Sequence, residues 1–277
     1  MIDEKILNIA KKYSLKGHVF KIDGPIYYLT APYWIISYWR KIFFIKSFLE
    51  KILIVNENGT IINDQEIFKK ISIIKFVPYP SKVHVENFRN ELSELEYVYN
   101  FFMKKPSNIG MINLTILNKK FKELNCLKAV KLIEEIEEKS KEIANVLEEL
   151  VNIKREIINM AEKLLSRKDS LLLEKFYEEI LNNEKTLFNK LKTLIEERII
   201  LIRKFRKIFE KYSKDIVENK KDEKLLIKNL KDDIIALFRF SCYINNKLKL
   251  YDMILNRLNE AKQRISNLYF SISKEIE

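Results

Sequence analysis

The spacing of hydrophobic residues changes character near residues 77–82. Before this point, apolar residues come in short runs separated by turn signals, which is typical of strands and short helices. After it, they recur every three or four positions for nearly 200 residues, which predicts long helices that each bury one apolar stripe. Pro78 and Pro80 disfavour helix at the boundary. We therefore predict two domains joined by a short Pro-rich linker at 78–82.

The N-terminal part, residues 1–77, predicts a small α+β domain. An apolar helical stripe starts at Ile6 and ends before Gly17, where a helix stop is expected. Four runs rich in β-branched and aromatic residues then predict strands. These runs are HVFKI, PIYYLT, YWIISYW and KILIVN. The pair Asn58-Gly59 favours a tight hairpin turn between the last run and the residues that follow.

The C-terminal part, residues 83–277, predicts an elongated, mainly α-helical antiparallel bundle or coiled coil. Its apolar positions alternate at spacings of three and four, and breaks in this stripe separate four helices. Their predicted ranges are 83–104, 111–165, 170–217 and 222–275. The segment 107–125 admits two interpretations. Its MINLTIL stretch alternates like a strand, whereas the spacing of Leu and Phe residues over the segment fits a helix. We favour the helix. Asp169 or Ser170 is the expected N-cap of the third helix.

Four positions of the predicted helix seams are polar. They are Ser140, Arg198, Ser241 and Lys262. A buried site between helices would explain them. The favoured interpretation is that they set the helix register, or that the long side chains lay their aliphatic stems along the seam and keep their charged ends in water.

Residues 1–70 resemble a PepSY-type (cystatin-like) unit. Such domains start with a helix, continue with a curved antiparallel sheet that often contains W-x-V, and end in a D-x-x-T/N-G-x-I/V hairpin. The corresponding pieces here are ILNIAKKY, YWIISY and VNENGTIIND, with Asn56 where an Asp is usual. Members of this family are mostly exported and are thought to bind or restrain peptidases or to sense ligands. The resemblance implies a small α+β domain used for binding, without catalytic residues.

Both tryptophans of the chain lie in the segment YWIISYW, residues 33–39. In a strand, Trp34 would lie on one face and Tyr33, Ile35 and Trp39 on the other. The N-terminal helix can cover one of these faces. We expect the second face to meet the helical bundle, another subunit or a protein partner, because large exposed apolar patches are uncommon. These four residues are therefore the candidate partner-binding residues.

The net charge of +12 makes an anionic partner possible. Residues 1–82 and 83–277 each carry about +6, so no single tail holds the excess. The third long helix has a basic stripe whose side chains could neutralise phosphates of nucleic acid or of an anionic membrane surface. Its candidate anion-binding residues are Arg203, Lys204, Arg206, Lys207, Lys211 and Lys214. Glu210, Asp215 and Glu218 lie close and would pair with them instead.

No catalytic or metal-binding pattern is present in the sequence. His18 and His84 have no Cys, His or carboxylate at ligand or triad spacing. Cys126 and Cys242 are two isolated thiols. Four glycines in 277 residues leave no closely spaced set to cradle a phosphate group. We expect a protein that is not an enzyme and has no cofactor and no metal.

The sequence also favours a cytoplasmic location. The longest nearly uncharged run is too short and too polar to span a bilayer, and the N-terminal segment is an amphipathic helix with charges throughout, unlike a signal peptide. Abundant Ile and Lys with two Gln resemble the usage of heat-loving archaea, although an AT-rich genome gives a similar bias.

The favoured function is a non-enzymatic interaction or scaffold protein. It would bind protein partners through the aromatic sheet face and form a homo-oligomer through its heptad seams, because amphipathic helices of this length must bury their stripes. The alternative is nucleic-acid or anionic-membrane-surface binding through the basic stripe.

Overall fold

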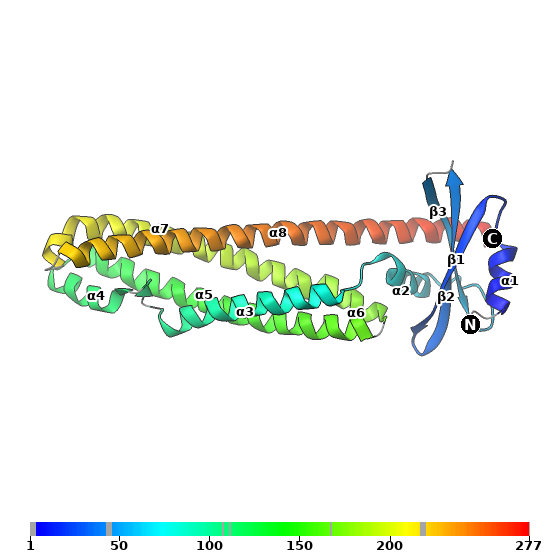
Figure 1. Cartoon of the computed structure of the whole chain (residues 1–277), viewed down its shortest axis with the longest axis horizontal. Helices are drawn as coiled ribbons and strands as arrows, with labels where there is room; N and C mark the ends of the chain where they lie inside the picture. Colours follow the sequence, from blue (N-terminus) through cyan, green and yellow to red (C-terminus); the bar gives the residue numbers. More distant parts are fainter. Residues whose placement is uncertain are drawn as a thin grey trace. The chain divides into compact units, whose positions relative to one another are not determined.

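The computed structural model describes residues 4–42, 46–106, 108–110, 112–166, 168–216 and 220–276. A small three-stranded antiparallel sheet near the N-terminus is followed by long helices, so the predicted α+β class with a mainly helical remainder is confirmed (Figure 1).

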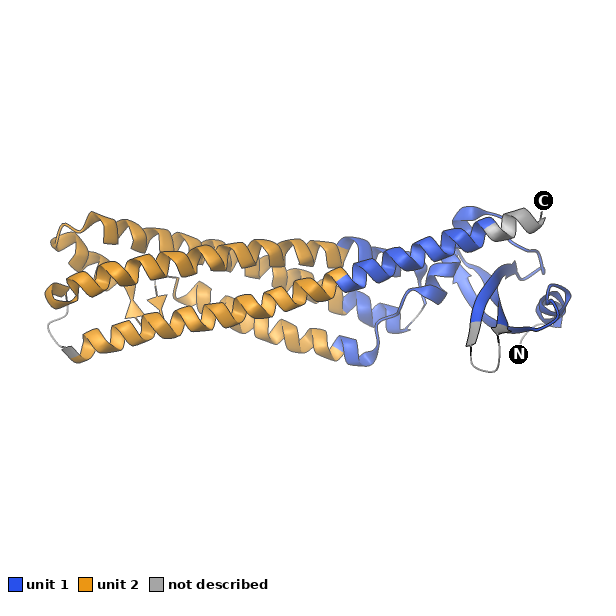
Figure 2. Ribbon diagram, turned by 90° about the horizontal axis from the view of Figure 1, so that it is seen from above, with its two compact units in different colours: residues 1–85, 159–179, 253–277 blue, residues 86–158, 180–252 orange. Residues whose placement is uncertain are grey.

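The chain divides into two compact units, each assembled from segments that are distant in sequence (Figure 2). Unit 1 contains Met1–Val85, Asn159–Glu179 and Met253–Glu277, and unit 2 contains Glu86–Ile158 and Ile180–Asp252. The boundary between the units falls inside three α-helices and one π-helical turn. The domain division at 78–82 stays a prediction.

Unit 1 is built around the sheet, in the order β1-β2-β3. Its N-terminal elements are α1 (Glu4–Lys12), β1 (His18–Tyr28), β2 (Ala31–Ile42), β3 (Lys46–Asn56) and α2 (Gln65–Phe76). The α1 and α2 helices lie on opposite faces of the sheet (Figure 1). Tyr38 of β2 donates a hydrogen bond to the Ala10 carbonyl oxygen of α1. On the other face, Lys75 of α2 forms an ion pair with Asp23 of β1.

Two of the predicted strand runs form one strand. HVFKI and the first four residues of PIYYLT belong to β1, whose register against β2 shifts between Asp23 and Ile26. At Gly24, a Cβ atom would lie 2.9 Å from both Cδ1 of Trp34 and the carbonyl oxygen of Tyr33. This close approach of β1 to β2 requires a residue without a side chain.

The turn at Asn58-Gly59 is present, but the second arm of the predicted hairpin is reduced to one bridge. Gly59 has a φ of +82°, and the Asn56 side chain accepts hydrogen bonds from the N–H groups of Asn58 and Thr60. Beyond the turn, the ladder is limited to a bridge between Val55 and Ile61.

The remaining elements are mostly long helices. They are α3 (Lys82–Lys104), β4 (Asn108–Ile109), β5 (Ile112–Asn113), α4 (Leu114–Glu123), α5 (Leu127–Ser166), α6 (Ser170–Lys175), a π-helical turn (Phe176–Ile180), α7 (Leu181–Ile216) and α8 (Lys220–Ile276). Within unit 2, the α3, α5, α7 and α8 helices pack as a four-helix bundle. The stripe of α5 forms part of its core, with Ile136, Ile143 and Leu147 fully buried.

The predicted helix over 111–165 is two helices with a sharp break at Asn125. This residue has a φ of +50°, a left-handed conformation that Asn tolerates better than most residues. The N–H of Cys126 donates to the Phe121 oxygen, and the N–H of Asn125 to the Lys122 oxygen. These two bonds form a Schellman motif that ends α4. The segment before α4 contains the short β4–β5 hairpin, so the strand and helix interpretations of 107–125 each hold for part of it.

The predicted third helix, 170–217, is interrupted by the π-helical turn Phe176–Ile180. The start of this helix is confirmed at Asp169, whose side chain accepts a hydrogen bond of 3.0 Å from the N–H of Leu172.

Candidate functional site

The aromatic strand β2 is covered on one face by α1. Tyr38 is fully buried, and its hydroxyl reaches the Ala10 oxygen at 3.1 Å. Burial raises the pKa of Tyr38, and the neighbouring Tyr13 adds to this effect. Ile36 lies on the same face and is also fully buried. This face is therefore core.

The other face of β2 is also closed at its centre, which corrects the prediction for Ile35. Ile35 is 0% exposed and Ser37 is equally buried, so neither offers surface to a partner. The physical reason is α2, which packs on the face that carries Asp23 and Ile35, because these two residues are paired across β1 and β2. The other candidates on this strand, Tyr33, Trp34 and Trp39, are half-buried.

The two histidines have structural hydrogen bonds. The Leu15 N–H donates to Nδ1 of His18 at 3.2 Å, which leaves Nε2 to donate to the Glu50 carboxylate at 2.6 Å. Arg40 donates to the same carboxylate. His84 accepts the Ser81 N–H at the start of α3. Both ring nitrogens of His18 are occupied, so this residue has no free lone pair with which to act as a base.

Two of the four polar seam positions meet in a buried network inside unit 2. Arg198 of α7 is 1% exposed and donates from Nε to the Ser140 hydroxyl of α5 at 3.1 Å. Its Nη1 donates to Asp233 of α8 at 3.0 Å, and its Nη2 to the Asn108 oxygen of β4 at 3.2 Å. Burial lowers the pKa of Arg198, and the Asp233 charge opposes this. The network links α5, α7 and α8 and satisfies the polar groups of Arg198 internally. That these positions set the helix register stays a prediction.

A second buried ionic network joins α3, α5, α7 and α8 in unit 2. Lys154 of α5 contacts Glu91 of α3 at 2.9 Å and also pairs with Glu184 of α7. On α8, Lys247 pairs with Glu91, and the Tyr251 hydroxyl donates to Glu184. Burial works to lower the pKa of Lys154, but the two carboxylates outweigh it and raise this pKa. The two lysines and two glutamates balance in charge, which is what a buried network requires.

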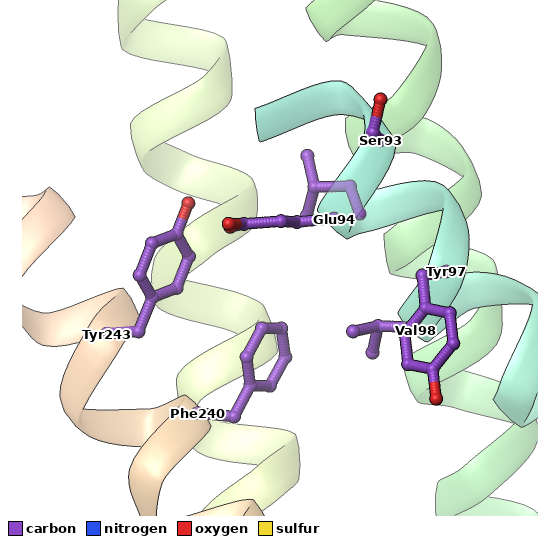
Figure 3. A pocket seen from close by; sticks show the side chains of 7 residues that line it. Ser93, Glu94, Tyr97, Val98, Phe240 and Tyr243 are labelled. Carbon is purple, nitrogen blue, oxygen red and sulfur yellow. The ribbon is translucent and has the colours of Figure 1, made fainter. Parts of the chain in front are cut away.

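A shallow apolar hollow of about 430 Å³ lies between α3 and α8 in unit 2. Its lining residues are Ser93, Glu94, Leu95, Tyr97, Val98, Phe240 and Tyr243. The rings of Phe240 and Tyr243 stack with centroids 6.0 Å apart. Figure 3 shows Phe240 facing Val98 and the Tyr243 hydroxyl directed toward the Glu94 carboxylate. Tyr97 turns outward and is 77% exposed. The hollow could accept an apolar side chain of a partner.

The net charge of the chain is concentrated in two segments of unit 2. Residues 104–133 and 200–231 contain 18 basic and 6 acidic residues, a net charge of +12. The rest of the chain contains 33 of each. These two segments carry +12, and the rest of the chain sums to zero because residues 1–82 carry +6 and the other residues carry −6.

The fold brings these two segments together. The rings of Phe121 on α4 and Phe205 on α7 meet at 5.8 Å, and Lys120 donates to the Ile216 oxygen at the end of α7 at 2.9 Å. Figure 1 shows α4 beside the region where α7 gives way to α8. We call residues 104–133 and 200–231 the basic end of unit 2.

The six predicted anion-binding residues all belong to the basic end. Arg206 is half-buried and pairs with Glu210 at 2.7 Å. The other five are exposed, and none of them forms an ion pair with a residue that the structure describes. They are Arg203, Lys204, Lys207, Lys211 and Lys214. Among the described residues, none of the six pairs with Asp215, and Glu218, also considered from the sequence, lies outside the described residues.

Eight further exposed lysines of the basic end were missed from the sequence. They are Lys104, Lys105, Lys119, Lys122, Lys128, Lys224, Lys228 and Lys231. Over the described ranges, none of these eight forms an ion pair. A signal for them exists, since both segments are rich in lysine, but it becomes informative only when the two segments are known to be neighbours.

No protein-family model, curated protein or solved structure matches this chain. The resemblance of residues 1–70 to PepSY-type units therefore stays a prediction. Within the described ranges, no His, Cys, Asp and Glu side chains are grouped to hold a metal ion. No helix in these ranges has an apolar stretch long enough to cross a membrane.

Proposed function

We propose that this chain is a non-enzymatic binding protein whose basic end takes a phosphate-bearing partner, either nucleic acid or an anionic membrane surface. The observation that carries this proposal is the charge of the basic end: +12 over two neighbouring segments, against a sum of zero elsewhere, where residues 1–82 carry +6 and the other residues carry −6. Exposed like charges closer than a Debye length of about 10 Å repel one another. An anionic partner relieves this repulsion and gains from every cation that it neutralises.

The geometry of α7 suits an extended anionic surface. Arg203, Lys207, Lys211 and Lys214 follow one another at spacings of four, four and three residues, so they share one side of the helix. Four residues of helix rise by about 6 Å, which gives a row of cations about one turn apart. The proposal of a non-enzymatic protein is supported by the occupied nitrogens of His18 and by the internal pairing of the buried carboxylates.

A charge-reversal variant tests this proposal. The variant R203E/K207E/K211E places three glutamates in the basic end. A matched control, K190E/R239E/K249E, makes the same change in net charge at three exposed positions of α7 and α8 outside the basic end. Binding would be measured by anisotropy for labelled duplex DNA and by flotation for vesicles that contain phosphatidylglycerol, at several salt concentrations.

We expect the unaltered protein to bind at least one of these two probes, with an affinity that falls steeply as salt rises. The basic-end variant should bind at least about tenfold more weakly, because each lost phosphate contact removes a released counterion. The control should lose much less. Absence of binding to both probes at low salt, or equal losses in the two variants, would overturn the proposal.

Self-association through the α3–α8 hollow is a second candidate function. The observation that favours it is the apolar lining of the hollow, which continues along α3 to the exposed ring of Phe101 one turn after Tyr97. Contiguous exposed apolar side chains of this kind are typical of interfaces. The occupant would be a second copy of this chain. Analytical ultracentrifugation should show a concentration-dependent dimer that Y97E abolishes, and a monomer at all concentrations would exclude it.

A further inference from the structure

The basic end exposes aliphatic side chains among its lysines. Five of them are about two-fifths exposed or more: Ile116 (61%), Leu124 (39%), Leu127 (75%), Ile200 (48%) and Leu225 (57%). Ile116 lies on α4, Leu124 and Leu127 lie in and after the α4–α5 turn, and Leu225 lies in the second turn of α8. Exposed leucines next to solvated lysines are a combination that phosphate binding alone does not need.

The α4–α5 turn presents its two leucines on a fixed backbone. The Schellman bonds from Asn125 and Cys126 close the end of α4, and the N–H of Ala129 donates to the Cys126 oxygen at the start of α5. The exposed lysines Lys122 and Lys128 flank the turn on either side. The turn is therefore a small aliphatic projection with a cation on each side of it.

The side-chain types of the basic end distinguish between phosphate-bearing partners. Of its 18 basic residues, 16 are Lys, and the Arg residues are Arg203 and Arg206. Its aromatic residues are buried or half-buried: Phe121, Phe205, Phe209 and Tyr212. Single-stranded nucleic acid is bound on exposed aromatic rings, and the bidentate contacts that read base edges in duplexes are made by Arg, Lys, Asn and Gln. Lysines interspersed with exposed Leu and Ile are instead typical of protein surfaces that lie at a membrane interface.

We propose that the basic end docks on a bilayer surface that carries anionic phospholipid headgroups. The lysines contact the phosphates, while Leu124 and Leu127 enter the boundary between headgroups and acyl chains, with Ile116 and Leu225 beside them. Lysine stems lie along apolar surface and keep their charged ends in water, so cations and leucines serve the same contact. This inference rests on the proposed function, because it names the partner of the same basic surface.

The test separates the leucines from the charges. The variant L124S/L127S keeps every cation of the basic end, and the control L171S/L250S alters two leucines of comparable exposure elsewhere. Each protein is floated with vesicles of phosphatidylcholine alone and of phosphatidylcholine with one third phosphatidylglycerol, and each is titrated with duplex DNA. Circular dichroism confirms that the variants remain helical.

We expect binding to the anionic vesicles and none to phosphatidylcholine alone. L124S/L127S should weaken vesicle binding by about tenfold, since each buried leucine contributes through its apolar area, and should leave DNA binding unchanged. The control should bind vesicles like the unaltered protein. Binding of duplex DNA without binding of anionic vesicles would overturn this inference and leave the proposed function intact. Vesicle binding that is insensitive to L124S/L127S would also overturn the role of the leucines.

Discussion

The sheet of unit 1 and the basic end of unit 2 differ in how well their sequence indicates what is exposed in the fold. The sheet carries both tryptophans and a dense aromatic cluster, yet the centre of β2 is buried on both faces by α1 and α2. The basic end has no such aromatic cluster and only an excess of lysine spread over two distant segments, yet most of its cations are exposed and unpaired among the described residues. The two regions differ in whether another helix packs over their side chains. A conspicuous segment becomes core when a second helix packs on it, while lysines spread over two distant segments become one surface when the fold brings the segments together.

The two regions also differ in what their side chains do for stability. A fully buried isoleucine contributes about 2–3 kcal/mol relative to an exposed one. An exposed cation contributes at most about 1 kcal/mol even when it is paired. Substitutions in the sheet should therefore change the free energy of unfolding, and substitutions in the basic end should change binding.

The largest effect is expected at Ile35. I35D places a carboxylate between β2 and α2 without a partner, which should cost at least about 4 kcal/mol and unfold unit 1. Urea denaturation followed by tryptophan fluorescence reports on this region, because both tryptophans lie in β2. The control L15D makes the same kind of change at a side chain that is 63% exposed and should cost little. A stable I35D protein would show that this face is open to a partner after all.

A buried cation of unit 2 sharpens the contrast with the basic end. K154M leaves Glu184 buried with its charge uncompensated, and breaking a buried pair in this way costs about 3–5 kcal/mol. K185M removes a lysine of the same bundle whose partner, Asp252, is exposed, and it should cost less than about 1 kcal/mol. The two variants can be compared by thermal unfolding. Equal losses would mean that burial does not decide the role of a lysine in this bundle.

Alkaline pH should weaken unit 1 by a smaller amount. Burial raises the pKa of Tyr177 from 10.0 to about 12, and its hydroxyl donates to the Pro78 oxygen. The folded state thus holds a proton that the unfolded state loses, so the stabilisation is complete below pH 10 and is lost as the pH rises toward 12. The loss attributable to this group is about 3 kcal/mol. Denaturation midpoints measured across this range should fall less steeply in Y177F, and an unchanged slope would contradict the assignment.

The long helices were predictable because their apolar stripes repeat over many turns. The predicted range 83–104 corresponds to α3 at Lys82–Lys104, for example. Interruptions were not predictable in the same way. The left-handed Asn125 and the π-helical turn change the backbone locally. They do not disturb the average spacing of apolar residues, so this spacing does not reveal them.

The error at Ile35 has a different origin, because α2 was not predicted. Its sequence QEIFKKISIIKF buries most of its apolar residues and lacks a clean one-sided stripe. A signal was nevertheless available: the Asp64 side chain caps the N–H groups of Glu66 and Ile67 at 2.8 and 3.0 Å. The six basic residues of α7 were predictable from one helix alone, whereas the other lysines of the basic end became part of the site only through the packing of α4 and α8 beside it.

The smallest effect is expected where the basic end itself is altered. K204Q/K207Q/K214Q removes three exposed positive charges that form no ion pair among the described residues, so the free energy of unfolding should change by less than about 0.5 kcal/mol. At low salt the change should be slightly stabilising, because the like-charge repulsion in the basic end is reduced, and added salt should abolish the difference by screening. Urea denaturation at low and high NaCl measures both. A loss of more than about 1 kcal/mol would mean that these lysines support the bundle. If the free energy of unfolding does not depend on these lysines, the positive charge of the basic end does not stabilise the fold. Binding is then the remaining physical reason for that charge.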